Sequence, residues 1–294
     1  MRKKKHPDIL VNRIKMAIDG RNRGIICILL MVILGILLWR SNIVHNIEAM
    51  ENPPMIGNMK YQSYVINMDK DTERYTKVGK YYEHSDLSSS PLIRYPAVVG
   101  RDVVANKWLT DDALSDLHHI VTNGYRTHHH QLTPGGIGCF LSHYNLAKQL
   151  VSDKSNVDAY IVFEDDTAIP KNISAHLQSY YKKVPDDWDY IMLYTIRSTG
   201  ASENEKINKL KSFWGMNGYV MNRKGAQKLV DETNTSKIDG QIDSYLSRMI
   251  QQDKMNIYAT KKHLITSNSQ DTNIQMILKP IKGVNPYDFK GYII

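Results

Sequence analysis

Three adjacent acids, Glu164, Asp165 and Asp166, directly follow a short apolar run over residues 159–163. The run is rich in β-branched and aromatic residues and is too short for a helix, which predicts a buried strand. Adjacent carboxylates repel one another and lose solvation when buried, and a cation beside them relieves both effects. Mg²⁺ and Mn²⁺ prefer such oxygen ligands together with substrate phosphates. The alternative is a solvated acidic turn.

A second polar segment with possible chemistry follows the apolar run Tyr64–Ile66. Asn67 ends this expected strand, and a polar turn then leads to Arg74. In an open α/β sheet, the first strand-to-helix turn often holds a nucleotide, and ligands bind outside the carboxyl ends of the strands. Asn67 and Arg74 are therefore candidate ligand contacts. For Arg74, a surface ion pair is an equal alternative.

Glycines mark a third segment, Gly135–His143. A helix that starts here places Gly135 and Gly136 where its N-terminus meets a phosphate, or where it packs closely on the sheet. Both interpretations stay open from the sequence. Ser142 and His143 are expected to form a polar pair between this helix and a loop.

The elements that position these residues alternate between strand and helix patterns. This order predicts an α/β fold with a mostly parallel sheet. The expected strands lie at 64–67, 95–99, 159–163, 190–194, 218–221 and 257–260. The expected helices lie at 71–82, 133–151, 173–183, 223–232 and 239–251.

Positive charge is concentrated at the N-terminus. Residues 1–40 hold nine basic and two acidic side chains, a net charge of +7 out of +8 for the whole chain. The rest of the chain is nearly neutral, which disfavours nucleic-acid binding. Residues 24–39 carry no charged side chain and would span about 24 Å as a helix, short of the usual bilayer core but suited to a thin secretory-pathway membrane.

The basic residues before 24–39 predict a signal anchor with a cytoplasmic N-terminus. A cleaved signal peptide is the alternative, but no small-x-small site follows Trp39. We therefore expect a cytoplasmic tail (1–23), a transmembrane helix (24–39), a stem (40–57) and a folded body (58–294). This arrangement describes a single-pass type II protein of the ER or Golgi, or an equivalent membrane, with a lumenal body.

Cysteine and histidine patterns add little. Cys139 is the one cysteine of the body, so no disulfide can form within it. The sequons at Asn172 and Asn234 suit a lumenal surface. The run 128–130 of three histidines is expected to be a polar loop, because adjacent histidines rarely bind one ion.

Six segments in order resemble glycosyltransferase family 25, which includes lipopolysaccharide-biosynthesis galactosyltransferases and procollagen galactosyltransferases. The matching segments are Val65–Lys70 with Arg74, Gly136–His143, Ile161–Asp166, Asp189–Tyr194, Gly218–Leu229 and Ile238–Asp239. The segment that follows the second expected strand has no counterpart that can be aligned, so the acceptor stays open.

The resemblance implies a GT-A-like fold and a metal-dependent transfer of a hexose, galactose or glucose, from a UDP-sugar with inversion. The body 58–294 would be the catalytic domain. The acceptor would be a hydroxyl of a glycan, a lipid-linked sugar or a collagen-like protein. Mn²⁺ or Mg²⁺ would stabilise the charge that develops on the UDP leaving group.

The resemblance also suggests roles for particular residues. Asp166 is expected to bind the metal directly, with Glu164 or Asp165 on the ribose or on a metal-bound water, and His263 as a distal metal ligand. Inversion needs a carboxylate base, and Asp239 and Asp243 are the candidates. For Asp239, a helix N-cap is the alternative.

Two other classes of function compete with sugar transfer. One is a membrane-anchored sugar-binding protein that keeps the fold without catalysis. The other is a nucleotidyl- or phosphotransferase that uses the carboxylates for two metals. The reaction products distinguish them: UDP with a glycosylated acceptor, pyrophosphate, or nothing.

Overall fold

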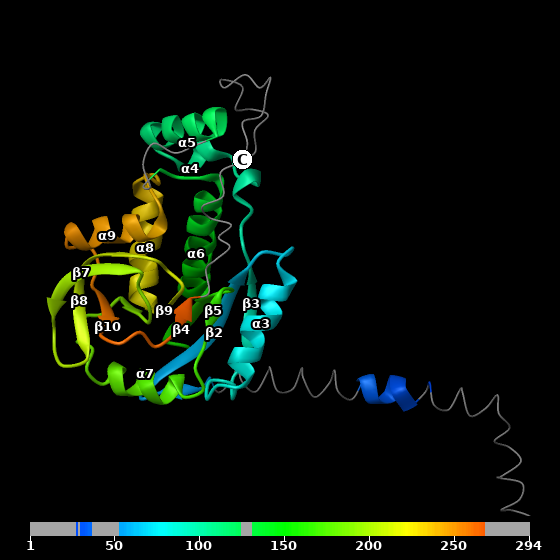
Figure 1. The fold of residues 1–294 in the computed structure, drawn as a ribbon. Coiled ribbons are helices and arrows are strands. Elements are labelled where there is room, and N and C mark those ends of the chain that lie inside the picture. Colours follow the sequence, from blue (N-terminus) through cyan, green and yellow to red (C-terminus); the bar gives the residue numbers. More distant parts are fainter. Residues whose placement is uncertain (1–27, 29, 37–52, 125–130, 268–294) are drawn as a thin grey trace, which may run out of the picture. The chain divides into compact units, whose positions relative to one another are not determined.

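The computed structural model describes residues 28, 30–36, 53–124 and 131–267, and the chain divides into two compact units, 1–51 and 52–294 (Figure 1). In the first unit, residues 30–36 are helical. Within the described ranges, no helix is both long and apolar enough to cross a membrane. Most of the predicted span 24–39 lies outside these ranges, as do the tail 1–23, residues 40–52 of the stem and the histidines 128–130.

The second unit is built on a large sheet. Its strands are β1 (Met55–Ile56), β2 (Met59–Asn67), β3 (Leu92–Pro96), β4 (Ala159–Glu164), β6 (Tyr190–Met192), β7 (Arg197–Ser202), β8 (Ile207–Trp214), β9 (Gly218–Asn222) and β10 (Ile257–Thr260). Two further strands, β5 (Thr167–Ala168) and β11 (Thr266–Ser267), form a separate pair. The predicted strand at 257–260 agrees with β10. The strand β1 falls within the last residues of the predicted stem.

The helices of this unit are α3 (Thr72–Glu83), α4 (Ala105–Trp108), α5 (Asp111–Asn123), α6 (Pro134–Ser152), α7 (Ile173–Tyr181), α8 (Arg223–Thr235) and α9 (Ile242–Gln251), with a 3-10 turn η1 at Gly100–Asp102. Helix α6 begins where the sequence predicts. The Thr133 hydroxyl accepts a hydrogen bond from the Gly136 amide at 2.9 Å, and Pro134 occupies the first turn.

The sheet is mixed, so the prediction of a mostly parallel sheet is wrong. The strand order is β1-β2-β4-β9-β6-β10-β8-β7, with β3 also paired to β2. The β2–β3, β2–β4 and β6–β10 pairs are parallel. The other pairs are antiparallel: β9 runs against both of its neighbours, β7–β8 is a hairpin at the edge, and β1–β2 and β8–β10 are antiparallel as well. Apolar periodicity reveals a strand but not its direction.

Helices cover the sheet on both faces (Figure 1). One core contains side chains of α6, α8 and α9, and the other contains side chains of α3 and α7. Strand β4 contributes to both: Tyr160 and Val162 face the first core, and Ile161 and Phe163 face the second. This alternation is the period-two geometry of a strand buried on both sides.

Candidate functional site

The strand order creates a crevice at the ends of β2, β3 and β4. Strand β2 lies between β3 and β4 and is parallel to both. The chain leaves β2 through α3 to reach β3 on one side, and returns through α6 to β4 on the other. Such a reversal opens a crevice at the carboxyl ends of the strands, where α/β proteins bind ligands.

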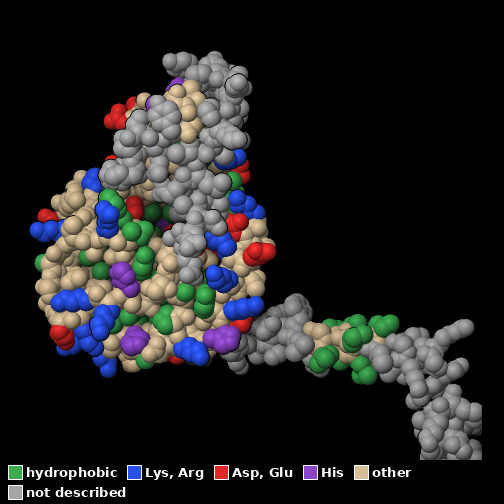
Figure 2. All heavy atoms as spheres, viewed as in Figure 1, with side chains coloured by type: hydrophobic (Ala, Val, Ile, Leu, Met, Phe, Trp, Pro, Cys, Tyr) green, Lys and Arg blue, Asp and Glu red, His purple; other side chains and the backbone are tan. Residues whose placement is uncertain are grey.

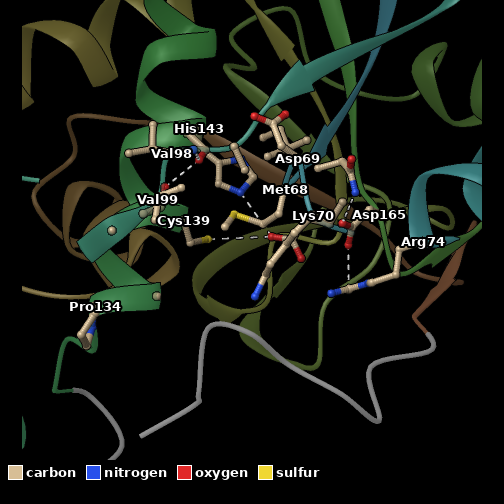
Figure 3. Close-up of a pocket in the computed structure, with 18 of the residues that line it drawn as sticks. Met68, Asp69, Lys70, Arg74, Val98, Val99, Pro134, Cys139, His143 and Asp165 are labelled. Carbon is tan, nitrogen blue, oxygen red and sulfur yellow. Dashed lines mark hydrogen bonds and ion pairs between the residues drawn. The ribbon is translucent and has the colours of Figure 1, made fainter. Parts of the chain in front are cut away.

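A cavity of about 530 Å³ occupies this place. Its walls come from 66–70 after β2, from 97–101 after β3, from 164–166 after β4, from 134–143 at the start of α6, and from Arg74. In Figure 3, Cys139 and His143 approach from α6 on one side of the cavity, and Arg74 approaches from the other. The volume lies in the range of small-molecule sites.

The alternation of β4 continues into the acidic triplet and separates its members. Glu164 points to the α6 side, where His143 lies 3.2 Å from its carboxylate. Asp165 points to the α3 side, where Arg74 lies 2.7 Å from its carboxylate. Period-two geometry thus gives two adjacent acids different partners.

Asp165 is the most buried acid of the three. Asn67 donates to its Oδ2 atom at 2.7 Å, and Arg74 donates to its Oδ1 atom. Burial, together with the charges of Asp166 and Glu164, raises the pKa of Asp165 to about 6, against the lowering effect of Asn67 and Arg74. Both oxygens of this carboxylate therefore have protein partners.

Asn67 links the ends of three strands. Its Nδ2 group donates to Asp165 beyond β4, and its Oδ1 atom accepts from Arg94 of β3 at 2.8 Å. Arg94 also pairs with Asp69 at 2.6 Å. Asn67 is 1% exposed, so its amide is fixed by this network. The predicted contact residue Asn67 thus lies at the site and orients Asp165.

Asn217, just before β9, holds the other two carboxylates together. Its Nδ2 group lies 3.2 Å from Glu164 Oε2 and 3.0 Å from Asp166 Oδ1. The Ser267 hydroxyl donates to Asp166 Oδ2 at 3.1 Å. Since β9 runs antiparallel to β4, with Gly218 opposite Phe163, residue 217 must lie beside the end of β4. Sheet pairing therefore brings the two regions together.

His143 is buried between Glu164 and Tyr219. Its Nε2 atom faces Glu164 Oε1, and its Nδ1 atom lies 2.7 Å from the Tyr219 hydroxyl. Burial raises the pKa of Tyr219 well above its usual value, so the hydroxyl keeps its proton and can donate to Nδ1. The imidazole then carries its proton on Nε2, directed at the carboxylate.

Cys139 lies one helical turn before His143, with its Sγ atom 4.0 Å from Glu164 Oε1. Burial and the charges of Glu164, Asp243 and Asp166 raise the pKa of this thiol well above its usual value. The group is therefore a neutral thiol at neutral pH in the metal-free protein.

Gly138 of α6 serves close packing. A Cβ atom on Gly138 would clash with the carbonyl oxygen of Val98 and with the backbone of Gly100. Ser142 strengthens the same contact, because its hydroxyl accepts from the Val98 amide at 2.8 Å. The expected bridge from helix to loop is confirmed for Ser142, whereas His143 points to Glu164. The segment 97–101 is thus held against α6 as a wall of the cavity.

Two further cations line the cavity. Lys70 and Arg101 are both exposed. Neither forms an ion pair with another residue of the described ranges, unlike Arg74, which is neutralised by Asp165. Over the face shown in Figure 2, basic and acidic side chains are otherwise scattered rather than gathered in one stripe.

The two candidate bases occupy different places, and neither lines the cavity. Asp243, in the first turn of α9, accepts from the Gly215 amide at 2.9 Å and so anchors the loop that carries Asn217. Asp239 is 40% exposed and pairs with Arg248. It precedes α9, which begins at Ile242 with Gln241 as the N-cap, so the capping alternative for Asp239 is wrong.

His263 lies away from the triplet. It packs against Tyr194 with ring centroids 4.6 Å apart and the rings tilted by 59°, and it lines a separate cavity of about 430 Å³. In the described part of the chain, the group of side chains close enough to share one metal ion is Cys139, His143 and Glu164. The structure therefore does not bring His263 into a ligand set with Asp166.

The acidic triplet fits a hard divalent cation. Glu164 and Asp166 line the cavity and share the Asn217 amide, and the charges of both contribute to the raised pKa of Asp165. Because both oxygens of Asp165 already pair with Asn67 and Arg74, Asp166 and Glu164 are the better available donors.

Sequence reasoning missed Asn217, Ser267, Lys70, Arg101 and the cavity-facing Cys139. The first two are distant from the triplet in sequence and reach it through strand pairing. The register of β9 against β4 was the missing information. Cys139 and His143 share one face of α6, a spacing that was visible in the sequence as C-x₃-H.

Comparison with known proteins identifies the family. The glycosyltransferase family 25 model (LPS biosynthesis protein) matches residues 60–246. A "Glycosyltransferase 25 family member" of Anopheles gambiae is 31% identical over 196 residues, covering 63% of this chain and 31% of that protein. Procollagen galactosyltransferase 1-B of Xenopus laevis is 26% identical, covering 60% of this chain and 30% of that protein.

These curated relatives are longer, and the matched region spans about a third of their length. Among solved structures, mouse xyloside xylosyltransferase 1 aligns with a TM-score of 0.29 and 10% identity, over 66% of this chain and 70% of that one, which is too distant to define the fold. The family match covers well over half of the chain and confirms the resemblance seen in its motifs. The chain therefore belongs to glycosyltransferase family 25.

Proposed function

We propose that this chain transfers a hexose, galactose or glucose, from a UDP-sugar to a hydroxyl acceptor, with inversion, on a GT-A-like fold. One observation carries the proposal: the cavity at the switch point of the sheet has carboxylates on one wall and two exposed cations, Lys70 and Arg101, that form no ion pair with other described residues. A nucleotide diphosphate bridged to a metal needs both kinds of group. The family membership supports the same reaction class.

The cations would orient the donor. Lys70 and Arg101 are exposed at the cavity and have no ion-pair partner in the described ranges, so their charges suit a bound diphosphate. Arg74 is held in place by Asp165 and presents its remaining donors to the cavity. Charge-assisted hydrogen bonds from such groups favour a bound phosphate.

The carboxylates would hold Mn²⁺ or Mg²⁺. Asp166, assisted by Glu164, would be the ligand, and Asn217 keeps these two side chains at one place. When bound, the ion would supply Lewis-acid stabilisation of the charge that develops on UDP. Asp165 would orient Arg74 and Asn67, rather than bind the ion, because both of its oxygens are occupied.

Of the two candidate bases, we favour Asp243. Its charge is close enough to raise the pKa of Cys139 at the cavity wall. Asp239 is committed to a surface ion pair with Arg248. An acceptor hydroxyl must give up its proton during inversion, and Asp243, although it does not line the cavity, is the candidate whose charge acts on the cavity wall.

The acceptor is proposed as a glycan, a lipid-linked sugar or a collagen-like polypeptide. The names of the relatives point to lipopolysaccharide and to procollagen. We further propose that residues 24–39 anchor the chain as a type II protein in the secretory pathway or an equivalent membrane, on the sequence pattern alone. Full-length protein should stay with membranes in alkaline carbonate, and a variant lacking residues 1–40 should be extracted.

The test measures UDP release by the full-length protein from a panel of UDP-sugars, with Mn²⁺ and then with EDTA. Release from one donor that EDTA abolishes is the expected result. Asp166→Ala should lose this release while still unfolding cooperatively on heating in EDTA, which shows that the variant is folded. Asp112→Ala, an exposed acid of α5, is the matched control and should keep full release.

Full metal-dependent release by Asp166→Ala would contradict the metal assignment. Pyrophosphate instead of UDP would favour a nucleotidyltransferase. Binding of a UDP-sugar without turnover, also with glycan and collagen-like acceptors present, would favour the sugar-binding alternative.

A further inference from the structure

A second group of metal-binding side chains lies on the α6 wall of the cavity. Cys139 and His143 are separated by one helical turn and share one face of α6, and Glu164 meets them from the end of β4. One ligand atom from each residue lies within 4.8 Å of the others. All three residues line the 530 Å³ cavity.

The separations suit a single ion. The Nε2 atom of His143 lies 3.2 Å from Glu164 Oε1, and the Sγ atom of Cys139 lies 4.0 Å from the same oxygen. Tetrahedral zinc with bonds of about 2.0–2.3 Å places its ligand atoms about 3.3–3.8 Å apart. Closing the group onto an ion therefore needs only small side-chain movements.

His143 is already oriented for coordination. Tyr219 holds Nδ1 at 2.7 Å, which fixes the ring with Nε2 directed at Glu164. A metal-binding histidine usually donates its other ring N–H to an oxygen, and the Tyr219 hydroxyl is placed to become that acceptor. On binding, the proton would move from Nε2 to Nδ1 and be donated to the Tyr219 oxygen. The Cys139 thiol would release its proton to solvent as the metal–sulfur bond forms.

We propose that Cys139, His143 and Glu164 form a zinc-type site with one coordination position open to the cavity. The sulfur and imidazole ligands favour a borderline-soft cation, whereas the all-oxygen set of the acidic triplet favours Mn²⁺ or Mg²⁺. The site goes beyond the proposed sugar transfer and needs no sugar nucleotide to be tested. Because Glu164 belongs to both groups, zinc here competes with a hard cation for that carboxylate.

The experiment uses full-length protein in detergent, loaded with Zn²⁺ or Co²⁺ and without any UDP-sugar. We expect one tightly held Zn²⁺ per chain by elemental analysis after dialysis. The Co²⁺ form should show thiolate-to-cobalt charge-transfer absorption, which an all-oxygen site lacks. Cys139→Ser should weaken zinc binding by about ten-fold or more and remove that absorption.

Cys27→Ser is the matched control, because it removes the other cysteine by the same substitution and should change neither result. Asp166→Asn should weaken Mn²⁺ binding while leaving the cobalt absorption in place. Melting temperatures in EDTA show whether the variants are folded. If Cys139→Ser does not fold, Cys139→Ala replaces it in these measurements.

Cobalt that binds without a thiolate absorption overturns the proposal, and this result needs no variant. The proposal is also overturned if Cys139→Ser binds zinc as tightly as the wild-type protein does. It is overturned as well if the wild-type protein retains no zinc after dialysis. Each of these measurements is independent of UDP release, so failure here is distinct from failure of the proposed transferase activity.

Discussion

The replacement of Asn217 by Asp tests whether one amide holds the acidic wall of the cavity together. Asn217 is 6% exposed and donates to both Glu164 and Asp166. Aspartate has the same shape, but it replaces the donating amide with a fourth carboxylate. Two attractive contacts become two repulsive ones, without a cavity and without a change in side-chain volume.

The size of the effect follows from the two contacts. Each hydrogen bond to a charged group is worth about 1.5–3 kcal/mol. The lower end applies because the Glu164 and Asp166 side chains are 17% and 10% exposed and so partly screened. The loss is therefore about 3 kcal/mol, which corresponds to a melting temperature lower by about 6–12 °C for a domain of this size.

Thermal unfolding in EDTA and in Mn²⁺ measures the effect. In EDTA, Asn217→Asp should melt well below wild type. Mn²⁺ should raise the melting temperature of the variant more than that of wild type, because the fourth carboxylate adds a hard ligand. Asn156→Asp, an exposed position with the same change in charge, should melt like wild type in both conditions.

Two outcomes would refute this reasoning. A melting temperature within about 1 °C of wild type in EDTA would mean that Asn217 does not hold the carboxylates. A variant that is less stable in EDTA but gains nothing extra from Mn²⁺ would mean that the triplet does not bind a hard cation.

Three other predictions concern single side chains around the cavity. The folded-state pKa of Asp165, about 6, exceeds its ordinary value of 3.8, so the native state holds an extra proton between these values. The free energy of unfolding in EDTA should therefore fall by up to about 3 kcal/mol as pH rises from about 4 to about 6. Urea titrations at several pH values measure this change, and the free energy of unfolding of Asp165→Asn should depend less on pH. The raised pKa of Cys139 predicts that in EDTA at neutral pH the folded protein is alkylated at this residue more slowly than the protein in urea, as peptide-resolved mass spectrometry can measure. Equal rates would contradict a neutral, partly buried thiol. Asp243→Asn keeps an acceptor for the Gly215 amide but removes the charge, so transfer should fall about 100-fold or more, with donor binding retained, whereas Asp239→Asn should stay near wild type. A large loss of transfer in Asp239→Asn, with little loss in Asp243→Asn, would restore Asp239 as the candidate base.

The elements with strong patterns were predictable from sequence. Strand β4 and helix α6 carry clear apolar periodicity, and Thr133 with Pro134 marks the start of α6. The hairpin of β7 and β8 was missed because every residue of β7 is exposed and polar or small, so it lacks the apolar alternation of a core strand. Helix α9 starts at Ile242 rather than 239, because the chain before it pairs Ile238 with Leu109.

The site was predictable only where its residues follow strands. Asn67, Arg74 and the triplet meet at one cavity because β2 and β4 are adjacent and parallel. Their catalytic roles remain predictions. Asn217 was not predictable, since its position depends on β9 running against β4, and no local pattern encodes that direction.

The alternation of β4 has a consequence for the insertions and deletions that this strand can accept. An added residue between Ala159 and Phe163 would shift each acid by one position, so Glu164 would take the place of Asp165, and Asp165 that of Asp166. Two added residues would restore the faces but shift the triplet by one full pleat, out of reach of Asn67. The number of residues in β4 is therefore fixed, since neither one nor two residues can be added without displacing the acids. The turn before Val157 is under no such constraint. Homologues should show length variation in that turn and none within the strand.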